Sequence, residues 1–408
     1  MNCRFCNNQL KNRFVSLGSS PLGNSFLTKE QLNKMEPFYP LEVYLCSNCF
    51  LVQLLEFESP ENIFSDYAYF SSYSDTWLKH AKNYVDKILN LFNISASSYV
   101  VEIASNDGYL LQYFIEKGIP VLGIEPAANV AEVAKQKGIP TEVVFFGTNT
   151  ARRLLSEGRS ADLIVGNNVL AHVPALNDFV EGLKILLKPC GVITMEFPHL
   201  MRLIDEVQFD TIYHEHFSYF SFLTVEKVFL AHDLTLFDVE ELPTHGGSLR
   251  IYARHQEDNT KPVSKRITEL RQREIDAGYK DINHYIGFSE KVKGIKWDIL
   301  KFLIRAKEEG NKIAGYGAPA KGNTLLNYCG IKTDFLTYTV DRSPHKQGHY
   351  LPGSHIPIEA PEKIRETKPD YLFILPWNIK EEIMEQMAFI REWGGKFVVP
   401  IPQLKVYE

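Results

Sequence analysis

The sequence predicts an α/β protein in three parts: an N-terminal zinc-binding domain, a central Rossmann-like domain and a second α/β domain at the C-terminus. Four cysteines form two Cys-x-x-Cys pairs within the first fifty residues. Short apolar strands alternate with amphipathic helices from about residue 98, and a similar alternation returns from about residue 312. A chain of 408 residues is also too long for one hydrophobic core.

The overall charge restricts the kind of partner. The formal net charge is −6, the isoelectric point is near 6.1, and no block of Lys and Arg occurs. This charge argues against binding to nucleic acid or to an anionic membrane. The N-terminus lacks the apolar run of a signal peptide, and no apolar stretch is long enough to span a bilayer. We therefore expect a cytoplasmic protein, and we expect it to be a monomer.

The cysteines define the N-terminal domain, placed at residues 1–65. The two pairs are formed by Cys3, Cys6, Cys46 and Cys49. In a reducing cytoplasm this pattern favours a tetrahedral zinc site, and four thiolate ligands leave no open position, so the zinc is expected to be structural. The long spacing between the pairs leaves plain thiols or a redox pair as the alternative. The lone Cys190 and Cys329 are expected to be buried in apolar surroundings.

An aromatic and hydroxyl-rich segment runs from Tyr67 to Trp77 and precedes a helical pattern over about residues 77–91. Aromatic stripes usually belong to a core, but these tyrosines are irregularly spaced. The segment is therefore a candidate for a substrate-facing wall or lid.

The central domain, placed at residues 66–243, has the alternation of a doubly wound, mainly parallel sheet. Its predicted strands cover residues 99–103, 121–124, 142–145, 163–165 and 192–196. Ligands of such sheets bind at the carboxyl ends of the strands, so the residues that follow each strand are the site candidates.

The loop after the first of these strands favours S-adenosylmethionine as the cofactor. Ala104 and Asn106 replace the first two glycines of the Gly-x-Gly-x-x-Gly pattern that a pyrophosphate needs, and S-adenosylmethionine carries no phosphate. Glu125 ends the next strand, where an acid can accept hydrogen bonds from ribose hydroxyls, although acids at strand ends are common in α/β proteins. We expect the cofactor to be bound by Glu102, Ala104, Asn106, Asp107, Gly108, Glu125, Asn167 and Asn168.

Four proton-handling side chains occupy consecutive positions in Tyr213-His214-Glu215-His216. A strand or helix would point these neighbours in different directions, and buried polar groups need partners, so the run is unsuited to a core segment. A solvated turn with two surface histidines is the alternative. The flanking tyrosines favour an active-site loop instead.

The C-terminal domain, placed at residues 244–408, contains a second strand-loop-helix of the nucleotide-binding kind. Two strands over about residues 234–254 and a charged helical stretch over residues 261–309 precede it. Gly315, Gly317 and Ala320 form a Gly-x-Gly-x-x-Ala pattern, and Lys321 opens the helix, as suits a diphosphate. Asp341 ends the next strand, where a ribose-binding acid is expected. A glycine turn required only by close packing is the alternative.

Taken together, these motifs resemble the S-adenosylmethionine-dependent C-methyltransferases that act on nucleotide-linked keto-deoxysugars in branched-sugar biosynthesis. The resemblance covers nearly the whole chain and rests on the two cysteine pairs and on residues 102–108, 213–218, 244–250 and 315–323. It implies a central class I methyltransferase domain and a C-terminal domain that helps to hold the nucleotide-sugar. The expected substrate-binding residues are Tyr67, His245, Arg250, Lys321, Asn323, Asp341 and Arg342.

The side chains suggest a mechanism for methylation at carbon. A 4-keto group acidifies the hydrogen on C3 of the sugar, and a base that removes it creates an enolate able to attack a sulfonium methyl group. We expect His216 to be the base, with Glu215 orienting it or stabilising its charge. Tyr213 and His172 are expected to donate hydrogen bonds to the enolate oxygen.

Two other functions remain open at this point. An NAD-dependent nucleotide-sugar oxidoreductase or epimerase would use the glycine loop near Gly315, but it leaves the central domain without a purpose. A non-enzymatic zinc-ribbon protein would bind nucleic acid or a protein partner, but it leaves the cluster at residues 213–216 unexplained.

Overall fold

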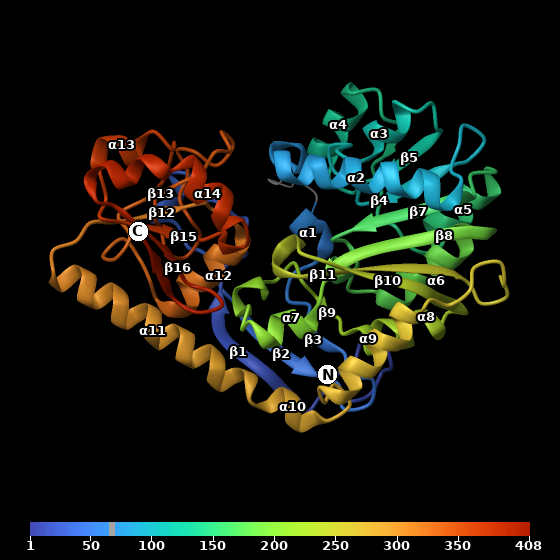
Figure 1. Cartoon of the computed structure of the whole chain (residues 1–408), viewed down its shortest axis with the longest axis horizontal. Helices are drawn as coiled ribbons and strands as arrows, with labels where there is room; N and C mark the ends of the chain where they lie inside the picture. The colour runs from blue at the N-terminus through green and yellow to red at the C-terminus, as the bar shows by residue number, and fades with distance from the viewer. Residues whose placement is uncertain (65–69) are drawn as a thin grey trace.

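The computed structural model describes residues 1–64 and 70–408. The residues described form three β-sheets, and the predicted three-part α/β architecture is confirmed. The central sheet (right) and the C-terminal sheet (left) stand apart in Figure 1, and the N-terminal strands lie below and between them.

The N-terminal sheet is antiparallel and has the order β1-β2-β3-β9. Its strands are β1 (Asn12–Ser20), β2 (Tyr39–Leu45), β3 (Val52–Leu54) and β9 (Ser218–Tyr219), and α1 (Pro60–Phe64) follows it. Strand β9 comes directly after the Tyr213–His216 cluster in the chain. The N-terminal sheet therefore fixes one end of the predicted active-site loop.

The central sheet has seven strands in the order β10-β11-β8-β7-β4-β5-β6. The five strands from β8 to β6 are parallel, whereas β11 and β10 form an antiparallel hairpin at one edge. The strands are β4 (Val100–Ile103), β5 (Val121–Ile124), β6 (Thr141–Glu142), β7 (Ala161–Asn167), β8 (Leu187–Pro198), β10 (Leu234–Leu242) and β11 (Ser248–His255). The hairpin extends this sheet beyond the domain boundary expected at residue 243, since β11 pairs with β8.

Helices cover the central sheet, and α2 lies over it in Figure 1. Trp77, Ala81, Tyr84 and Ile88 recur at helical spacing on the buried face of α2. The Ser74 side chain caps this helix by accepting a hydrogen bond from the backbone of Trp77. The helices are α2 (Asp75–Phe92), α3 (Leu111–Ile115), α4 (Ala128–Gln136), α5 (Thr148–Ser156), α6 (Leu176–Leu186), α7 (Leu200–Asp205) and α8 (Phe222–Leu230).

The charged stretch expected to be helical over residues 261–309 forms three helices, α9 (Lys265–Asp276), α10 (Ile282–Ile286) and α11 (Phe288–Glu308). Gly278 takes a φ of +93°, a left-handed conformation that interrupts the helix after α9. Helix α11 then runs below β1 toward the C-terminal sheet (Figure 1).

The C-terminal sheet has the order β14-β13-β12-β15-β16-β17, with β17 as its antiparallel edge. Its strands are β12 (Ile313–Tyr316), β13 (Thr339–Val340), β14 (Ile358–Glu359), β15 (Tyr371–Ile374), β16 (Lys396–Val399) and β17 (Lys405–Tyr407). Its helices are α12 (Ala320–Cys329), α13 (Lys363–Thr367) and α14 (Lys380–Gln386).

The N-terminal strands share one continuous apolar core with the C-terminal domain. The rings of Phe14 and Phe288, for example, stack with centroids 4.5 Å apart. Cys329 is buried as expected, but the prediction for Cys190 is wrong, because that residue is exposed near the beginning of β8. Within the described residues, no helix combines the length and the apolar character needed to cross a membrane.

Candidate active site and metal centre

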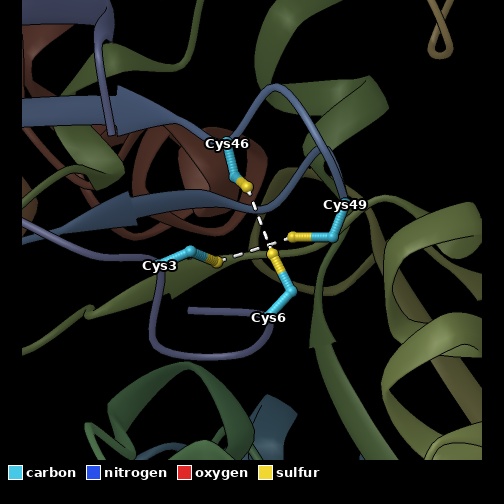
Figure 2. A group of neighbouring side chains, drawn as sticks. All are labelled: Cys3, Cys6, Cys46 and Cys49. Carbon is cyan, nitrogen blue, oxygen red and sulfur yellow. Dashed lines mark hydrogen bonds between the residues drawn. The ribbon is translucent and has the colours of Figure 1, made fainter. Parts of the chain in front are cut away.

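The four N-terminal cysteines converge on one point (Figure 2). Their sulfur atoms all lie within 4.8 Å of one another, and the Cys3–Cys49 and Cys6–Cys46 sulfur pairs are each 3.5 Å apart. Sulfur atoms bound at about 2.3 Å from a tetrahedral zinc are about 3.8 Å apart, so the cluster fits that ion. The Gln53 side chain donates a hydrogen bond to Cys3 Sγ, as a residue orienting a metal ligand does.

A cavity of about 970 Å³ is lined by residues from all three parts of the chain. It lies at the carboxyl ends of β4, β5 and β7, and β12 of the C-terminal sheet ends at its other side. Of the predicted site residues, the cavity brings together Ala104, Asn106, Glu125, Asn167, Asn168, His172, Tyr213, His216, His245, Lys321, Asp341 and Arg342. Tyr67 lies outside the described residues.

The turn after β4 is shaped by left-handed backbone at Ala104 and Asn106, which lets the chain turn tightly at the strand end. The Asn106 backbone N–H donates to Glu125 Oε2 at 2.9 Å, and the Ala127 N–H donates to Glu125 Oε1 at 2.8 Å. Burial raises the pKa of Glu125 to about 7, although these two backbone hydrogen bonds oppose the rise. Each carboxylate oxygen keeps a second lone pair that a ribose hydroxyl could use.

Two amide oxygens in the cavity wall lack a hydrogen-bond donor among the described residues. These atoms, Asn167 Oδ1 and Asn168 Oδ1, line the cavity and are buried. Buried acceptors normally have a donor, so these oxygens suit a ligand that carries N–H groups. The α-ammonium group of S-adenosylmethionine is such a donor, and the residues at this end of the cavity therefore fit that cofactor.

Three residues predicted to bind the cofactor lie behind the cavity wall. The carboxyl of Glu102 is buried beside Tyr109, and burial raises its pKa well above the ordinary value. Asp107 turns toward Lys137, whose Nζ is 3.3 Å from its Oδ2. A Cβ at Gly108 would lie 2.1 Å from Ile139 Cδ1, so this glycine serves close packing at a φ of +77°. Sequence alone could not separate these residues from their cavity-lining neighbours.

The predicted catalytic residues form an aromatic cluster. The His216 ring lies 4.1 Å from the Tyr213 ring and 4.7 Å from the His172 ring, centroid to centroid. His216 Nδ1–H donates to the Thr211 carbonyl at 2.8 Å, which leaves Nε2 as the atom with a lone pair. Burial, assisted by the nearby His172, lowers the pKa of His216 well below its ordinary value. The imidazole is therefore neutral near pH 7 and able to accept a proton.

The other two members of the run Tyr213-His214-Glu215-His216 face elsewhere. The His214 ring donates to the Pro40 carbonyl at 3.2 Å, outside the cavity. Glu215 is buried, and its Oε1 accepts a hydrogen bond of 2.6 Å from Asn24. Asn24 itself lines the cavity. Sequence reasoning missed Asn24, since nothing in the pattern around it suggests a site.

The hairpin turn between β10 and β11 brings His245 into the cavity. His245 has a φ of +55°, which is uncommon for a residue other than glycine and often accompanies function. Asn168 Nδ2 donates to His245 Nε2 at 3.1 Å. Burial lowers the pKa of His245 to about 4, and burial likewise lowers that of His172 to about 4.

Arg250 was predicted to bind substrate, but its guanidinium lies behind the cavity and pairs with Glu196 at 2.5 Å. His80 donates to the same carboxylate at 2.9 Å, and Thr244 donates to its other oxygen at 2.8 Å. Arg250 therefore supports the turn that carries His245 rather than reaching the cavity itself. The sequence could not show this, because Arg250 and Glu196 belong to different strands.

The glycine loop of the C-terminal sheet forms the far wall. Gly317 has a φ of +90°, and a Cβ there would lie 2.5 Å from Pro376 Cδ, so only glycine fits. The Ala318 backbone N–H donates to Asp341 Oδ2 at 2.7 Å. Asn323 does not line the cavity, contrary to its predicted role, because its side chain is buried inside α12 against Asn327.

The ammonium group of Lys321 is buried in the cavity wall. Its Nζ is 4.5 Å from the centroid of the Trp377 ring, and Trp377 donates to Asp210 Oδ2 at 2.6 Å. Burial lowers the pKa of Lys321 to about 8, although Asp210 opposes this effect. Burial also raises the pKa of Asp210 to about 6, although Lys321 and the Trp377 N–H oppose it. The Lys321 ammonium group thus lies close enough to His216 and His245 to lower the pKa of both further than burial alone does.

Family models match all three parts of the chain. A zinc binding domain matches residues 3–64, a methyltransferase domain residues 77–239, and a C-methyltransferase C-terminal domain residues 243–402. The C-methyltransferase NovU of Streptomyces niveus is 33% identical over 404 residues, 99% of this chain and 96% of the relative. The chain belongs to the S-adenosylmethionine-dependent C-methyltransferases. The NAD-dependent oxidoreductase and the non-enzymatic zinc-ribbon alternatives are therefore wrong, and the predicted cofactor and structural zinc are confirmed.

Three other similar proteins match only part of this C-methyltransferase. The ubiquinone biosynthesis O-methyltransferase of Bartonella tribocorum is 29% identical over 94 residues, 23% of this chain and 38% of the relative. The magnesium protoporphyrin IX methyltransferase of Synechocystis, solved with S-adenosylmethionine, is 14% identical and covers 44% of this chain and 81% of its own, with a TM-score of 0.33. An S-adenosylmethionine-dependent methyltransferase from Mesorhizobium loti is 14% identical, covers 44% of this chain and 100% of its own, and has a TM-score of 0.35.

Proposed function

We propose that this C-methyltransferase transfers a methyl group to C3 of a nucleotide-linked 4-keto-6-deoxysugar. The observation that carries the proposal is the shared cavity, which joins the carboxyl end of the central sheet, the side chains of Tyr213 and His216, and the glycine loop near Gly317. S-adenosylmethionine would bind at the carboxyl end of the central sheet, the sugar ring beside Tyr213 and His216, and the nucleotide diphosphate at the glycine loop. This order would place the sugar between its nucleotide and the methyl donor.

The donor end is proposed to use the residues of the central sheet that reach the cavity. S-adenosylmethionine supplies a methyl group on its positively charged sulfur. Glu125 would accept hydrogen bonds from the ribose hydroxyls, and the unpaired amide oxygens of Asn167 and Asn168 would accept those of the α-ammonium group. Replacing Glu125 with Gln removes the charge but keeps the shape, so we expect at least about tenfold weaker binding of S-adenosylhomocysteine by calorimetry.

His216 is the proposed base. Its Nε2 takes the C3 proton, the electron pair of the C–H bond moves toward the 4-keto oxygen, and the resulting C3 carbanion takes the methyl group as the carbon–sulfur bond breaks. Tyr213 and His172 would donate hydrogen bonds to the enolate oxygen, where negative charge develops. Burial, with smaller contributions from the nearby histidines and Lys321, keeps the pKa of His216 low. The negative charge of the enolate would favour the protonated imidazole once the enolate forms.

The C-terminal wall is proposed to hold the nucleotide. Gly317 allows a close approach of backbone to phosphate, and Lys321 contributes a buried cation. Asp341 would accept from a ribose hydroxyl, and the half-exposed Arg342 would pair with phosphate in place of its 3.7 Å contact with Glu382. Glu215 keeps the role of supporting His216.

Mass spectrometry across a panel of thymidine and guanosine diphosphate 4-keto-6-deoxysugars tests the proposal. We expect a single added methyl group, located on C3 by nuclear magnetic resonance. A methyl on oxygen or nitrogen, or no product with any sugar, would contradict it.

His216→Ala tests the assignment of the base. Removing a general base typically costs 10²–10⁴-fold in rate, and we also expect solvent deuterium to stop exchanging at C3 in the absence of donor. His349→Ala, which changes a histidine outside the cavity, is the matched control and should leave both rates unchanged. Deuterium exchange that persists in His216→Ala would move the base to another residue.

A further inference from the structure

A loop of the N-terminal domain leaves its own sheet and lies against the C-terminal domain. Leu27 and Tyr350 exchange two backbone hydrogen bonds of 3.0 and 2.9 Å. Farther along, Glu36 accepts from the Gly353 backbone at 2.8 Å and from His355 at 2.9 Å. The loop is therefore fixed at two points on a surface far from it in the sequence.

The close contact of this loop with α12 depends on Gly23. A Cβ at Gly23 would lie 2.9 Å from the Cβ of Ala320, the first residue of α12, so a larger residue would push the loop away. The next residue, Asn24, lines the cavity. Its Nδ2 donates to Glu215 Oε1 at 2.6 Å, across 191 positions of sequence.

The hydrogen bond from Asn24 helps to stabilise the buried Glu215 carboxylate. Its residue is 3% exposed, and a buried carboxylate without hydrogen bonds is strongly disfavoured. It stands directly before His216, whose backbone N–H closes a turn onto the Tyr213 carbonyl at 2.9 Å. A shift of the Glu215 side chain would therefore displace both Tyr213 and His216, which begin and end this short turn.

We propose that Asn24 is a positioning residue of the catalytic centre: its side-chain amide holds the Glu215 carboxylate and thereby fixes the turn that carries Tyr213 and His216. The inference rests on the proposed function, in which these two side chains act on the sugar. A neutral amide suits this place because it donates a hydrogen bond without adding a cation beside the base. The N-terminal domain thus completes the active site as well as binding zinc.

Two variants test whether Asn24 acts by donating a hydrogen bond to Glu215 or only by occupying the space beside it. Asn24→Ala removes the amide, and Asn24→Asp keeps its shape but replaces the N–H donor with a carboxyl group. Asn33→Ala is the matched control, because Asn33 belongs to the same segment and is exposed. Each is assayed for kcat and KM with the sugar identified by the panel, together with melting temperature, zinc content and affinity for S-adenosylhomocysteine.

We expect Asn24→Ala to lower kcat about 10- to 100-fold, the range for a hydrogen bond to a charged group, with KM and the other properties within about twofold of wild type. Asn24→Asp should be as impaired near neutral pH, because two adjacent carboxylates repel one another. It should recover as the pH falls toward about 5, since two adjacent carboxyls share a proton and the introduced acid can then donate to Glu215. Asn24→Ala should show no such recovery.

Three results would overturn the inference while the wild type remains active: rates within twofold of wild type for both variants, the same pH profile for both, or a parallel loss of zinc, stability and donor affinity. If the wild type methylates no sugar, the proposed function fails instead. The contact is then judged from the carboxyl carbon signal of Glu215 in protein labelled with [13C]glutamate and assigned with Glu215→Gln. An unchanged signal in Asn24→Ala would overturn the inference, and a shifted one would support it.

Discussion

Replacing Glu196 with Gln tests the charged support beneath the hairpin turn. Glu196 is fully buried, and its partner Arg250 is 3% exposed. Burial alone would raise the pKa of Glu196, but the His80 hydrogen bond and the Arg250 charge lower it from 4.5 to about 2. At about 1.4 kcal/mol per pKa unit, the ionised carboxylate therefore stabilises the folded protein by about 3 kcal/mol.

The sign of this effect fixes its pH dependence. Because the pKa is lower in the folded protein, the stabilisation is complete above about pH 4.5 and is lost as the pH falls toward about 2. Glu196→Gln also leaves Arg250 buried without an anion, which typically costs 3–5 kcal/mol. For a chain of 408 residues, a loss of about 3 kcal/mol lowers the melting temperature by about 3.5 °C.

Differential scanning calorimetry of wild type and Glu196→Gln between about pH 8 and about pH 3 measures this effect. Asp86→Asn is the matched control, since the Lys82–Asp86 pair has side chains 54% and 46% exposed and should contribute less than about 0.5 kcal/mol. A loss no greater than that of Asp86→Asn, or a loss equally large at the lowest pH, would refute the reasoning.

Four further predictions concern the pH dependence of activity, packing at the glycine loop and the zinc site. The acid limb of the kcat/KM profile should lie well below pH 6.5, because His172 and His245 have pKa values of about 4 and His216 is also lowered; an acid limb near 6.5 would contradict the buried histidine cluster. Raising the pH through about 8 should increase KM for the sugar as Lys321 loses its proton, and Lys321→Met should abolish that rise. Gly317→Ala should weaken sugar-nucleotide binding without changing affinity for S-adenosylhomocysteine, because its Cβ would lie 2.5 Å from Pro376; Gly310→Ala, at a similar φ of +81° but with open space around it, separates this clash from backbone strain. Removing zinc with a chelator should lower the melting temperature and the solubility, measured beside metal content by mass spectrometry, whereas a metal-free protein of unchanged stability would show that the four cysteines serve another purpose.

The local sequence pattern was sufficient to predict most of the strands and helices. The alternation of strands and helices depends on spacing along the chain. The predicted strand at residues 121–124 coincides with β5, and the one at residues 163–165 lies within β7. The charged helical stretch predicted over residues 261–309 is helical, but the sequence pattern did not locate the break near Gly278, where the chain takes a positive φ. The hairpin of β10 and β11 was recognised as two strands, but its pairing with β8 is a long-range choice that no local pattern encodes.

The sequence by itself determined the zinc ligands, the methyl donor and the turn of residues 213–216, because each depends on side chains close together in the chain or on the missing glycines of one loop. Only the tertiary structure decided which of these residues reach the cavity. It turned Arg250 toward Glu196, enclosed Asn323 within α12, and brought Asn24 to Glu215 across 191 positions. The physical reason is that buried charges and amides must find partners, and the partners available are set by how strands and loops pack, not by the order of residues.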